Sequence, residues 1–298
     1  MLLQIIINSI INALLISLVA LGFNLIFSTT KVFHLAHGAI YVFSAYSYWT
    51  VIKFLFAGNS TSPQGILTAI VITTLLIFLL VWVIEKLIYK PISDRTSNQT
   101  ITLIASMGVY LFIVNALAMC FNNDNKSLSN EVLRSLNFGN IILTKIQLWQ
   151  AFVAIVILII VTLFYKYSDY GLKIIATKDN YKVSSSMGID VSKIRLLSLL
   201  IGSMLAATAA ILTGYDTGFD PNIGFGITLT AAVIVVLSGN LSIIGTLTAS
   251  FIIIFIQNLT EYWLSTQWKE PITFLILLLV ILWKTEGIVN FNIRIEEK

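Results

Sequence analysis

The strongest constraint on this fold is a series of long apolar runs that are nearly free of charge. The runs cover residues 5–29, 39–57, 66–89, 100–121, 147–165, 194–214, 225–238, 245–264 and 271–283. Only 11% of the 298 residues are charged, against roughly 25% in soluble domains. A helix needs about 20 apolar residues to cross a bilayer. We therefore predict an all-α integral membrane protein, a polytopic bundle of about eight to ten transmembrane helices that includes interrupted helices.

The spacing of these runs leaves no room for a separate soluble domain. We expect a single transmembrane domain over residues 1–298, with the connection 166–195 as a basic loop within it. The first charged residue is Lys31, so the N-terminal apolar stretch lacks the basic region of a secretory signal. We expect it to be retained as a membrane helix.

The distribution of Lys and Arg predicts the orientation. Thirteen of the 18 basic residues fall in four alternate connections, at 30–38, 85–99, 166–195 and 284–298. Connections rich in Lys and Arg stay in the cytoplasm, so we assign these four, and with them the C-terminus, to the cytoplasmic side. The side of the N-terminus depends on whether segment 30–38 leaves the membrane, and the sequence leaves this open.

The segment from Thr29 to Ala39 separates the first two apolar runs with polar and small residues. It is too short for a comfortable external loop, so we expect a helix break at membrane depth, where protein or water satisfies the exposed amides. A helix that begins near Gly38 would point its N-terminal N–H groups into the break and favour an anion or a carboxylate. A short cytoplasmic turn is the alternative.

A second interruption, from Leu237 to Gly245, is again polar and small between apolar runs. Paired interruptions in the two halves of a transporter are typical of a structural repeat with the solute between them. Uncharged polar groups in a span need a partner on a neighbouring helix or a wet cavity. We therefore predict a translocation path lined by Asn24, His34, His37, Gly38, Tyr41, Gly239, Ser242, Gly245 and Gln257.

The sequence lacks the motifs of common catalytic sites. The phosphate-loop pattern GxxxxGK[ST] is absent, as are GxSxG, HExxH and CxxC. The two histidines have no cysteine or third histidine nearby to complete a metal site. No basic cluster of the kind that binds nucleic acid is present. We expect no catalytic residue, no metal and no nucleic-acid partner.

The internal connection 166–195 has features of a structured cytoplasmic element. It contains no proline between Gly171 and Ser192, and Thr177 is a candidate helix N-cap. Gly188 is a candidate helix stop. We predict a short helix at about 177–187 that lies across the cytoplasmic surface, with a solvated connector as the alternative.

Several motifs occur in order between about residue 10 and residue 290. They are His34-Leu35-Ala36-His37-Gly38, Gly188-Ile189-Asp190-Val191, and Gly239 with Ser242-Ile243 and Gly245. In this order and spacing the chain resembles the permease subunits of the branched-chain amino acid ABC importers. That family also includes subunits for urea and short amides.

The resemblance implies a transport subunit that is not itself an enzyme, binds no cofactor and works by alternating access. Two separate ATP-binding subunits would bind ATP and Mg, and a second permease subunit would complete the path. An extracytoplasmic solute-binding protein would deliver the solute to this multi-pass protein of the bacterial inner membrane. The residues expected at the contact with the ATPase are Thr177, Lys178, Asp179, Lys182, Ser185, Met187, Gly188 and Ile189.

Departures from the family pattern leave the solute open. His34 and Leu35 stand where the family motif has an asparagine and an aromatic residue, and Gln257 stands at a position that is often acidic. We expect branched-chain or other hydrophobic amino acids. Urea or a short amide is the first alternative, and a gradient-driven carrier that acts without an ATPase is the second.

Overall fold

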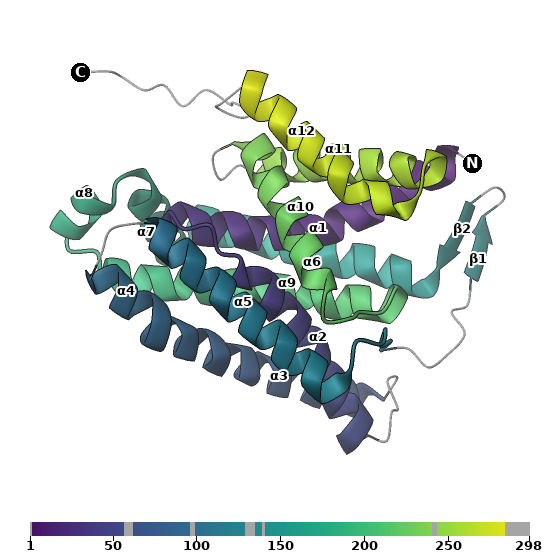
Figure 1. Ribbon diagram of the computed structural model, residues 1–298, viewed down its shortest axis with the longest axis horizontal. Coiled ribbons are helices and arrows are strands. Elements are labelled where there is room, and N and C mark those ends of the chain that lie inside the picture. The colour runs from purple at the N-terminus through teal and green to yellow at the C-terminus, as the bar shows by residue number, and fades with distance from the viewer. Residues whose placement is uncertain are drawn as a thin grey trace.

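In a computed structural model the chain forms a bundle of long helices (Figure 1). The structure describes residues 2–56, 62–95, 99–128, 135–138, 141–239 and 243–283. The helices are α1 (Leu2–Thr30), α2 (Ala36–Leu55), α3 (Pro63–Ile84), α4 (Lys90–Arg95), α5 (Gln99–Phe121), α6 (Lys145–Tyr167), α7 (Asp169–Asp179), α8 (Tyr181–Ser186), α9 (Val191–Asp216), α10 (Ile223–Ser238), α11 (Ile243–Trp263) and α12 (Lys269–Trp283). A π-helical turn, η1 (Glu85–Tyr89), joins α3 to α4, and a 3-10 turn, η2 (Thr266–Trp268), precedes α12. Strands β1 (Ser135–Phe138) and β2 (Ile141–Thr144) pair as an antiparallel hairpin.

Each predicted apolar run corresponds to a helix within the described residues, and this confirms the all-α polytopic membrane fold. Among the described residues, six helices are long and apolar enough to cross a bilayer: Leu2–Thr30, Pro63–Arg95, Gln99–Phe121, Lys145–Tyr167, Val191–Asp216 and Ile243–Trp263. The helix α10 is apolar but has 16 residues, fewer than the roughly 20 of a full span. The range of eight to ten spans therefore stays a prediction.

The helix α1 lies at the centre of the bundle. Its most apolar window is 72% buried, whereas the corresponding windows of α3 and α6 are each 22% buried. It packs against α9, α10 and α11. The peripheral helices α3 and α6 expose apolar side chains such as Leu75 and Phe152, which suits contact with lipid.

The two ends of α1 are fixed to different parts of the chain. Near its start, Gln4 Nε2 donates to the Ile142 carbonyl and Gln4 Oε1 accepts from the Ile142 N–H, both at 2.9 Å. Beyond its end, Lys31 Nζ donates to the Lys178 carbonyl at 3.2 Å. The hairpin and α7–α8 therefore lie at opposite ends of the bundle (Figure 1). We call these the hairpin end and the α7–α8 end.

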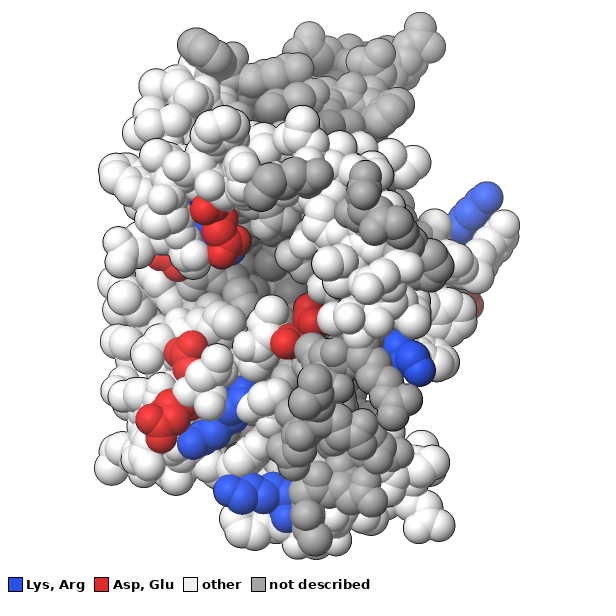
Figure 2. All heavy atoms as spheres, turned by 90° about the vertical axis from the view of Figure 1, so that its right-hand side faces the viewer, with Lys and Arg blue, Asp and Glu red and all other residues white. Residues whose placement is uncertain are grey.

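The two ends also differ in charge. At the hairpin end, acidic and basic side chains are interspersed among uncharged ones (Figure 2), and Lys126 lies 3.7 Å from Asp124 while Lys269 pairs with Glu261. At the α7–α8 end, the connection 166–195 carries six basic residues. The basic loop that predicts the cytoplasmic side therefore lies opposite the hairpin.

The connection 166–195 is helical, but the boundaries predicted for its helix are wrong at the start. The helices α7 and α8 replace the single helix predicted at 177–187, and the chain is extended between them at Asn180. Thr177 is not a cap, because it is buried within α7 and its hydroxyl donates to the Lys173 carbonyl at 2.8 Å. Asn180 performs that role, since its Oδ1 accepts from the Val183 N–H at 3.2 Å.

The predicted helix stop at Gly188 is confirmed. Gly188 has a φ of 84°, in the left-handed region that favours glycine. The Ile189 N–H donates to the Ser184 carbonyl at 3.1 Å, and the Gly188 N–H donates to the Ser185 carbonyl at 3.0 Å. These two bonds form the Schellman motif that closes a helix C-terminus.

Candidate functional site

The break between α1 and α2 enters the interior of the bundle, as predicted. His34 and His37 are 2% and 0% exposed, so the alternative of a short cytoplasmic turn is wrong. His37 Nε2 lies 3.2 Å from the Val19 carbonyl oxygen. Val19 is eleven residues before the end of α1 at Thr30, which corresponds to about 16 Å of helix. The helix α2 therefore begins well inside the membrane-spanning region.

Side chains from α5 and η1 hold the backbone of this break. The Tyr89 hydroxyl lies 2.8 Å from His34 Nδ1, in hydrogen-bond contact. Ser106 Oγ accepts from the Leu35 N–H at 3.3 Å. Both Tyr89 and Ser106 are buried. Protein groups thus supply the partners that a broken helix needs at membrane depth.

Two pairs of glycines bring helix backbones into direct contact near the break. Gly22 of α1 faces Gly202 of α9, and Gly38 of α2 faces Gly224 of α10. In each pair, a Cβ atom on either glycine would overlap the carbonyl oxygen of the other. Small residues permit this close approach of helices in a membrane. Gly38 therefore positions α2 against α10.

The segment before α10 corresponds to the break before α2. Phe33 precedes Gly38 by five residues, and Phe219 precedes Gly224 by five. Each segment follows a long helix, α1 or α9, and leads into a shorter one. Because α1 ends at the α7–α8 end and α9 begins there, the two units run in opposite directions, as in an inverted repeat.

The structure adds a contact that was not identified from the sequence, because Gly38 packs against Gly224. The pairing of the break with the interruption from Leu237 to Gly245 as a structural repeat stays a prediction. The later interruption does separate α10 from α11, and Gly239 ends α10 with a φ of 67°. Ser242 lies outside the described residues. A break in a helix is visible in a sequence, but its contact partner is not.

The remaining residues predicted for the path lie in different surroundings. Asn24 is buried in α1, and its Nδ2 has no hydrogen-bond partner in the described part of the chain. Tyr41 is buried in α2. Gln257 of α11 is half-buried and donates to Thr273 Oγ1 at 2.8 Å, and thus belongs to a contact between α11 and α12. The lining of a path by these residues stays a prediction.

The structure contains an ion pair near the break that was not included in the site predicted from the sequence. Arg195 Nε lies 3.1 Å from Glu85 Oε1, with side-chain exposures of 16% and 10%. Glu85 opens η1, and Arg195 lies in the second turn of α9. The signal for this pair was an acid at the end of one apolar run and a base at the start of another, since such charges are usually paired.

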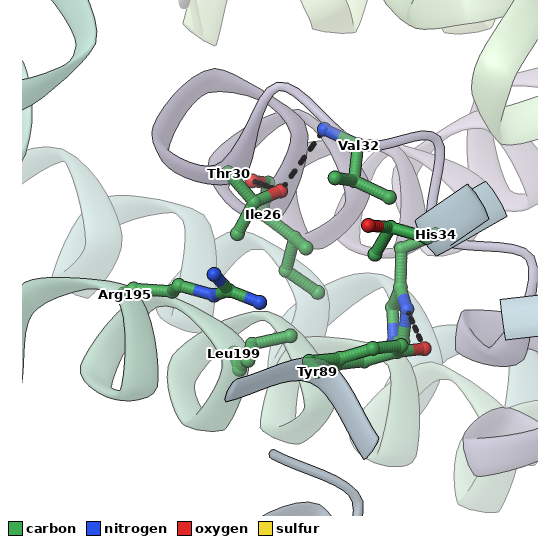
Figure 3. Close-up of a pocket in the computed structure, with 8 residues that line it drawn as sticks. Ile26, Thr30, Val32, His34, Tyr89, Arg195 and Leu199 are labelled. Atoms are coloured by element: carbon green, nitrogen blue, oxygen red, sulfur yellow. Dashed lines mark hydrogen bonds between the residues drawn. The ribbon is translucent and has the colours of Figure 1, made fainter. Parts of the chain in front are cut away.

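The guanidinium and the break share a small cavity (Figure 3). It is lined by Ile26, Thr30, Val32, His34, Tyr89, Thr102, Arg195 and Leu199. Its volume is about 10 Å³, which is close to the space that one water needs. The cavity is therefore far too small for an amino acid, and the conformation is closed at this point.

The residues predicted to contact the ATPase lie in α7, in α8 and in the turn that follows α8, which projects from the bundle (Figure 1). Thr177 is buried within α7. Val183 and Met187 are 48% and 75% exposed. Partial burial lowers the pKa of the Lys178 ammonium, although the neighbouring Asp179 carboxylate opposes this. The hydrogen bond from the Lys193 N–H lowers the pKa of Asp190, the N-cap of α9. A short helix with exposed apolar side chains is thus joined to α9 by a capped turn.

The described residues contain no group of three or more His, Cys, Asp or Glu side chains that could hold a metal ion. The polar groups that the structure places around the break are backbone and hydroxyl groups, the two histidines and the ion pair of Glu85 with Arg195.

Comparison with known proteins gives a match along most of the chain. The profile of a family described as "Branched-chain amino acid transport system / permease component" matches residues 5–282. The chain is 28% identical to the high-affinity branched-chain amino acid transport system permease protein LivH of Escherichia coli, covering 92% of this chain and 91% of that protein. It is 26% identical to the permease protein BraD of Pseudomonas aeruginosa, with the same two coverages. No solved structure matches the chain.

Proposed function

Because the chain belongs to the family of branched-chain amino acid transport permeases, we propose that it is the membrane subunit of an ATP-driven importer. The solute is a branched-chain or other hydrophobic amino acid, and it crosses the bacterial inner membrane by alternating access. The relatives are transport permease subunits. The chain performs no hydrolysis itself and binds no cofactor.

The observation that carries this proposal is the exposed helix α8 at the basic end of the bundle. It lies outside the six long apolar helices, and yet Val183 of α8 and Met187, in the turn that follows α8, are exposed. Exposed apolar side chains gathered on a short projecting element favour contact with a partner protein. We assign α8 to the contact with an ATP-binding subunit, and hence the α7–α8 end to the cytoplasm.

The helix break supports the transport step. The two oppositely directed units, α1–α2 and α9–α10, meet at Gly38 and Gly224. In transporters built from inverted repeats, one unit rocks against the other around a central site. A hydrophobic zwitterion can be accommodated there by helix ends and uncharged polar groups. A second permease subunit and an extracytoplasmic solute-binding protein complete the importer.

Uptake of labelled leucine by the reconstituted importer tests the function. Uptake should require both ATP and the ATP-binding subunits, and unlabelled leucine should compete whereas urea should not. Transport by this chain alone in liposomes would overturn the proposal in favour of a gradient-driven carrier. Competition by urea and not by leucine would retain the importer and replace the solute.

A further inference from the structure

The ion pair of buried Glu85 with partly buried Arg195 lies where it can control the helix break. We propose that Glu85 and Arg195 close the break toward the α7–α8 end, and that displacement of α8 opens this closure. The second half of the proposal rests on the proposed function, because it takes α8 as the contact with the ATPase. The two residues are positioning residues, since they act on the break through their neighbours.

The first step is the connection from α8 to Arg195. Only residues 187–190 separate the end of α8 from the start of α9. This link is defined at both ends, by the Schellman motif at Gly188 and by the Asp190 cap, which accepts from the Lys193 N–H at 3.1 Å. A short and doubly fixed link transmits a displacement of α8 to the first turns of α9, where Arg195 lies.

The second step is the connection from Arg195 to the break. Glu85 and Tyr89 are the first and last residues of η1, and both are buried. Glu85 contacts Arg195, and Tyr89 contacts His34. Figure 3 shows Arg195, Tyr89 and His34 around the same small cavity. The π-helical turn thus links α9 to the residues that precede α2, and such turns are frequent at functional sites.

The third step is that several polar atoms around the ion pair lack hydrogen-bond partners within the described residues, as expected of a contact that must open. Arg195 Nε lies 3.1 Å from Glu85 Oε1 but makes no aligned hydrogen bond in the part of the chain that the structure describes. Within the described residues, Glu85 Oε2 and His34 Nε2 also lack hydrogen-bond partners. Buried charges gain most from a pair whose remaining bonds are all satisfied, and a partly satisfied network holds one conformation less firmly. Water entering the cavity would supply the missing bonds.

The competing interpretation is an ion pair that only holds η1 against α9. It predicts a loss of stability on mutation but no selective change in access to the cavity. Access is therefore the quantity to measure. Thr102 of α5 lines the cavity and is 6% exposed, so a cysteine at this position reports on opening.

The experiment uses the full chain in membrane vesicles, with Cys120→Ser to remove the single native cysteine and Thr102→Cys as the reporter. Labelling by a membrane-impermeant maleimide is followed in inverted and in right-side-out vesicles. In this background Glu85→Gln and Arg195→Gln should each raise the labelling rate by more than about tenfold, which corresponds to about 1.4 kcal/mol. The increase should occur from the α7–α8 end only.

Two controls separate closure from folding. The charge exchange, Glu85→Arg with Arg195→Glu, should restore slow labelling, which a general loss of structure would not allow. Lys193 lies in α9 two residues before Arg195, and Lys193→Gln breaks its exposed ion pair with Asp190, the N-cap of α9. This variant should leave the labelling rate unchanged. Unchanged labelling in Glu85→Gln, or failure of the exchanged pair to restore protection in correctly assembled protein, would overturn the proposal.

The coupling to α8 is measured in the assembled importer. A non-hydrolysable ATP analogue traps the ATP-binding subunits, and this should change the labelling rate of Thr102→Cys in protein that keeps the Glu85–Arg195 pair. The same analogue should not change the labelling rate in the Arg195→Gln variant. A nucleotide response that is the same with and without Arg195 would overturn the coupling. A failure of the proposed function is distinguishable, because the vesicle experiment requires neither ATP nor the partner subunits.

Discussion

Single glycines decide how closely the helices of this bundle approach each other. At Gly38 and Gly224, as at Gly22 and Gly202, the backbone of one helix occupies the space that a Cβ on the other would fill. By contrast, a Cβ at Gly108 of α5 would meet nothing within 4 Å. The same residue type is therefore essential for packing at some positions and replaceable at another.

This contrast gives a matched pair of variants. Gly38→Val should destabilise the protein by about 1–3 kcal/mol, the usual cost of overpacking a close contact. Gly108→Val should change stability by less than about 1 kcal/mol. Thermal unfolding of the purified protein in detergent measures both. Equal effects of the two substitutions would contradict the close contact between α2 and α10.

At the scale of elements, α8 is held by a cap at one end and a glycine at the other. Asn180→Ala removes the cap and should cost about 1 kcal/mol of local stability, so that α8 amides exchange with solvent about fivefold faster. Hydrogen exchange followed by mass spectrometry measures this. Thr177→Val is the control, because the Thr177 hydroxyl bonds within α7. If the α8 amides exchanged faster in Thr177→Val but not in Asn180→Ala, Thr177 and not Asn180 would be the N-cap.

The exposed turn at the end of α8 gives a functional prediction. Met187→Glu places a charge in the expected contact with the ATP-binding subunit and should reduce ATP-dependent leucine uptake by more than about tenfold, or about 1.4 kcal/mol. The amount of chain inserted in the membrane should not change, since Met187 is 75% exposed. Lys193→Gln, in the first turn of α9, is the matched control, and its uptake should equal that of the unchanged protein. Full uptake by Met187→Glu would argue against α8 as the docking element.

At the scale of the whole molecule, the two ends of α1 are bound to opposite ends of the bundle. Gln4 ties the first turn of α1 to the hairpin, whereas Lys31 ties the end of α1 to α7. With the α7–α8 end in the cytoplasm, as proposed, the first turn of α1 lies on the external side. The sequence had left this side open, because it could not show whether segment 30–38 enters the bundle.

The orientation predicts the labelling of two exposed positions in a Cys120→Ser background. A cysteine in place of Met187 should react with an impermeant reagent only in inverted vesicles. A cysteine in place of Ile142, which is 58% exposed on β2, should react only in right-side-out vesicles. Labelling of both positions from one side would contradict opposite ends for the hairpin and α8. If the cysteine at 187 reacted only in right-side-out vesicles and the cysteine at 142 only in inverted ones, the cytoplasmic assignment of the basic connections would be contradicted.

The sequence by itself determined the features that depend on local composition. Long apolar runs form helices in a membrane because each helix satisfies its own backbone, and Gly188 stops α8 because its left-handed φ suits glycine. The break before α2 was visible for the same reason, as polar and small residues interrupt an apolar run. Thr177 was misassigned because a Thr hydroxyl can bond a carbonyl inside a helix as well as cap one.

Only the tertiary structure decided which segments meet. A helix such as α1 is apolar on all sides, so no amphipathic pattern marks the face that contacts α9 or α10. The contact between Gly38 and Gly224 and the pair of Glu85 with Arg195 each join residues far apart in the chain. Such contacts arise from helix packing, where small residues and buried charges find partners across helices. The break was therefore predictable from composition, while its partner helix and its closing ion pair were not.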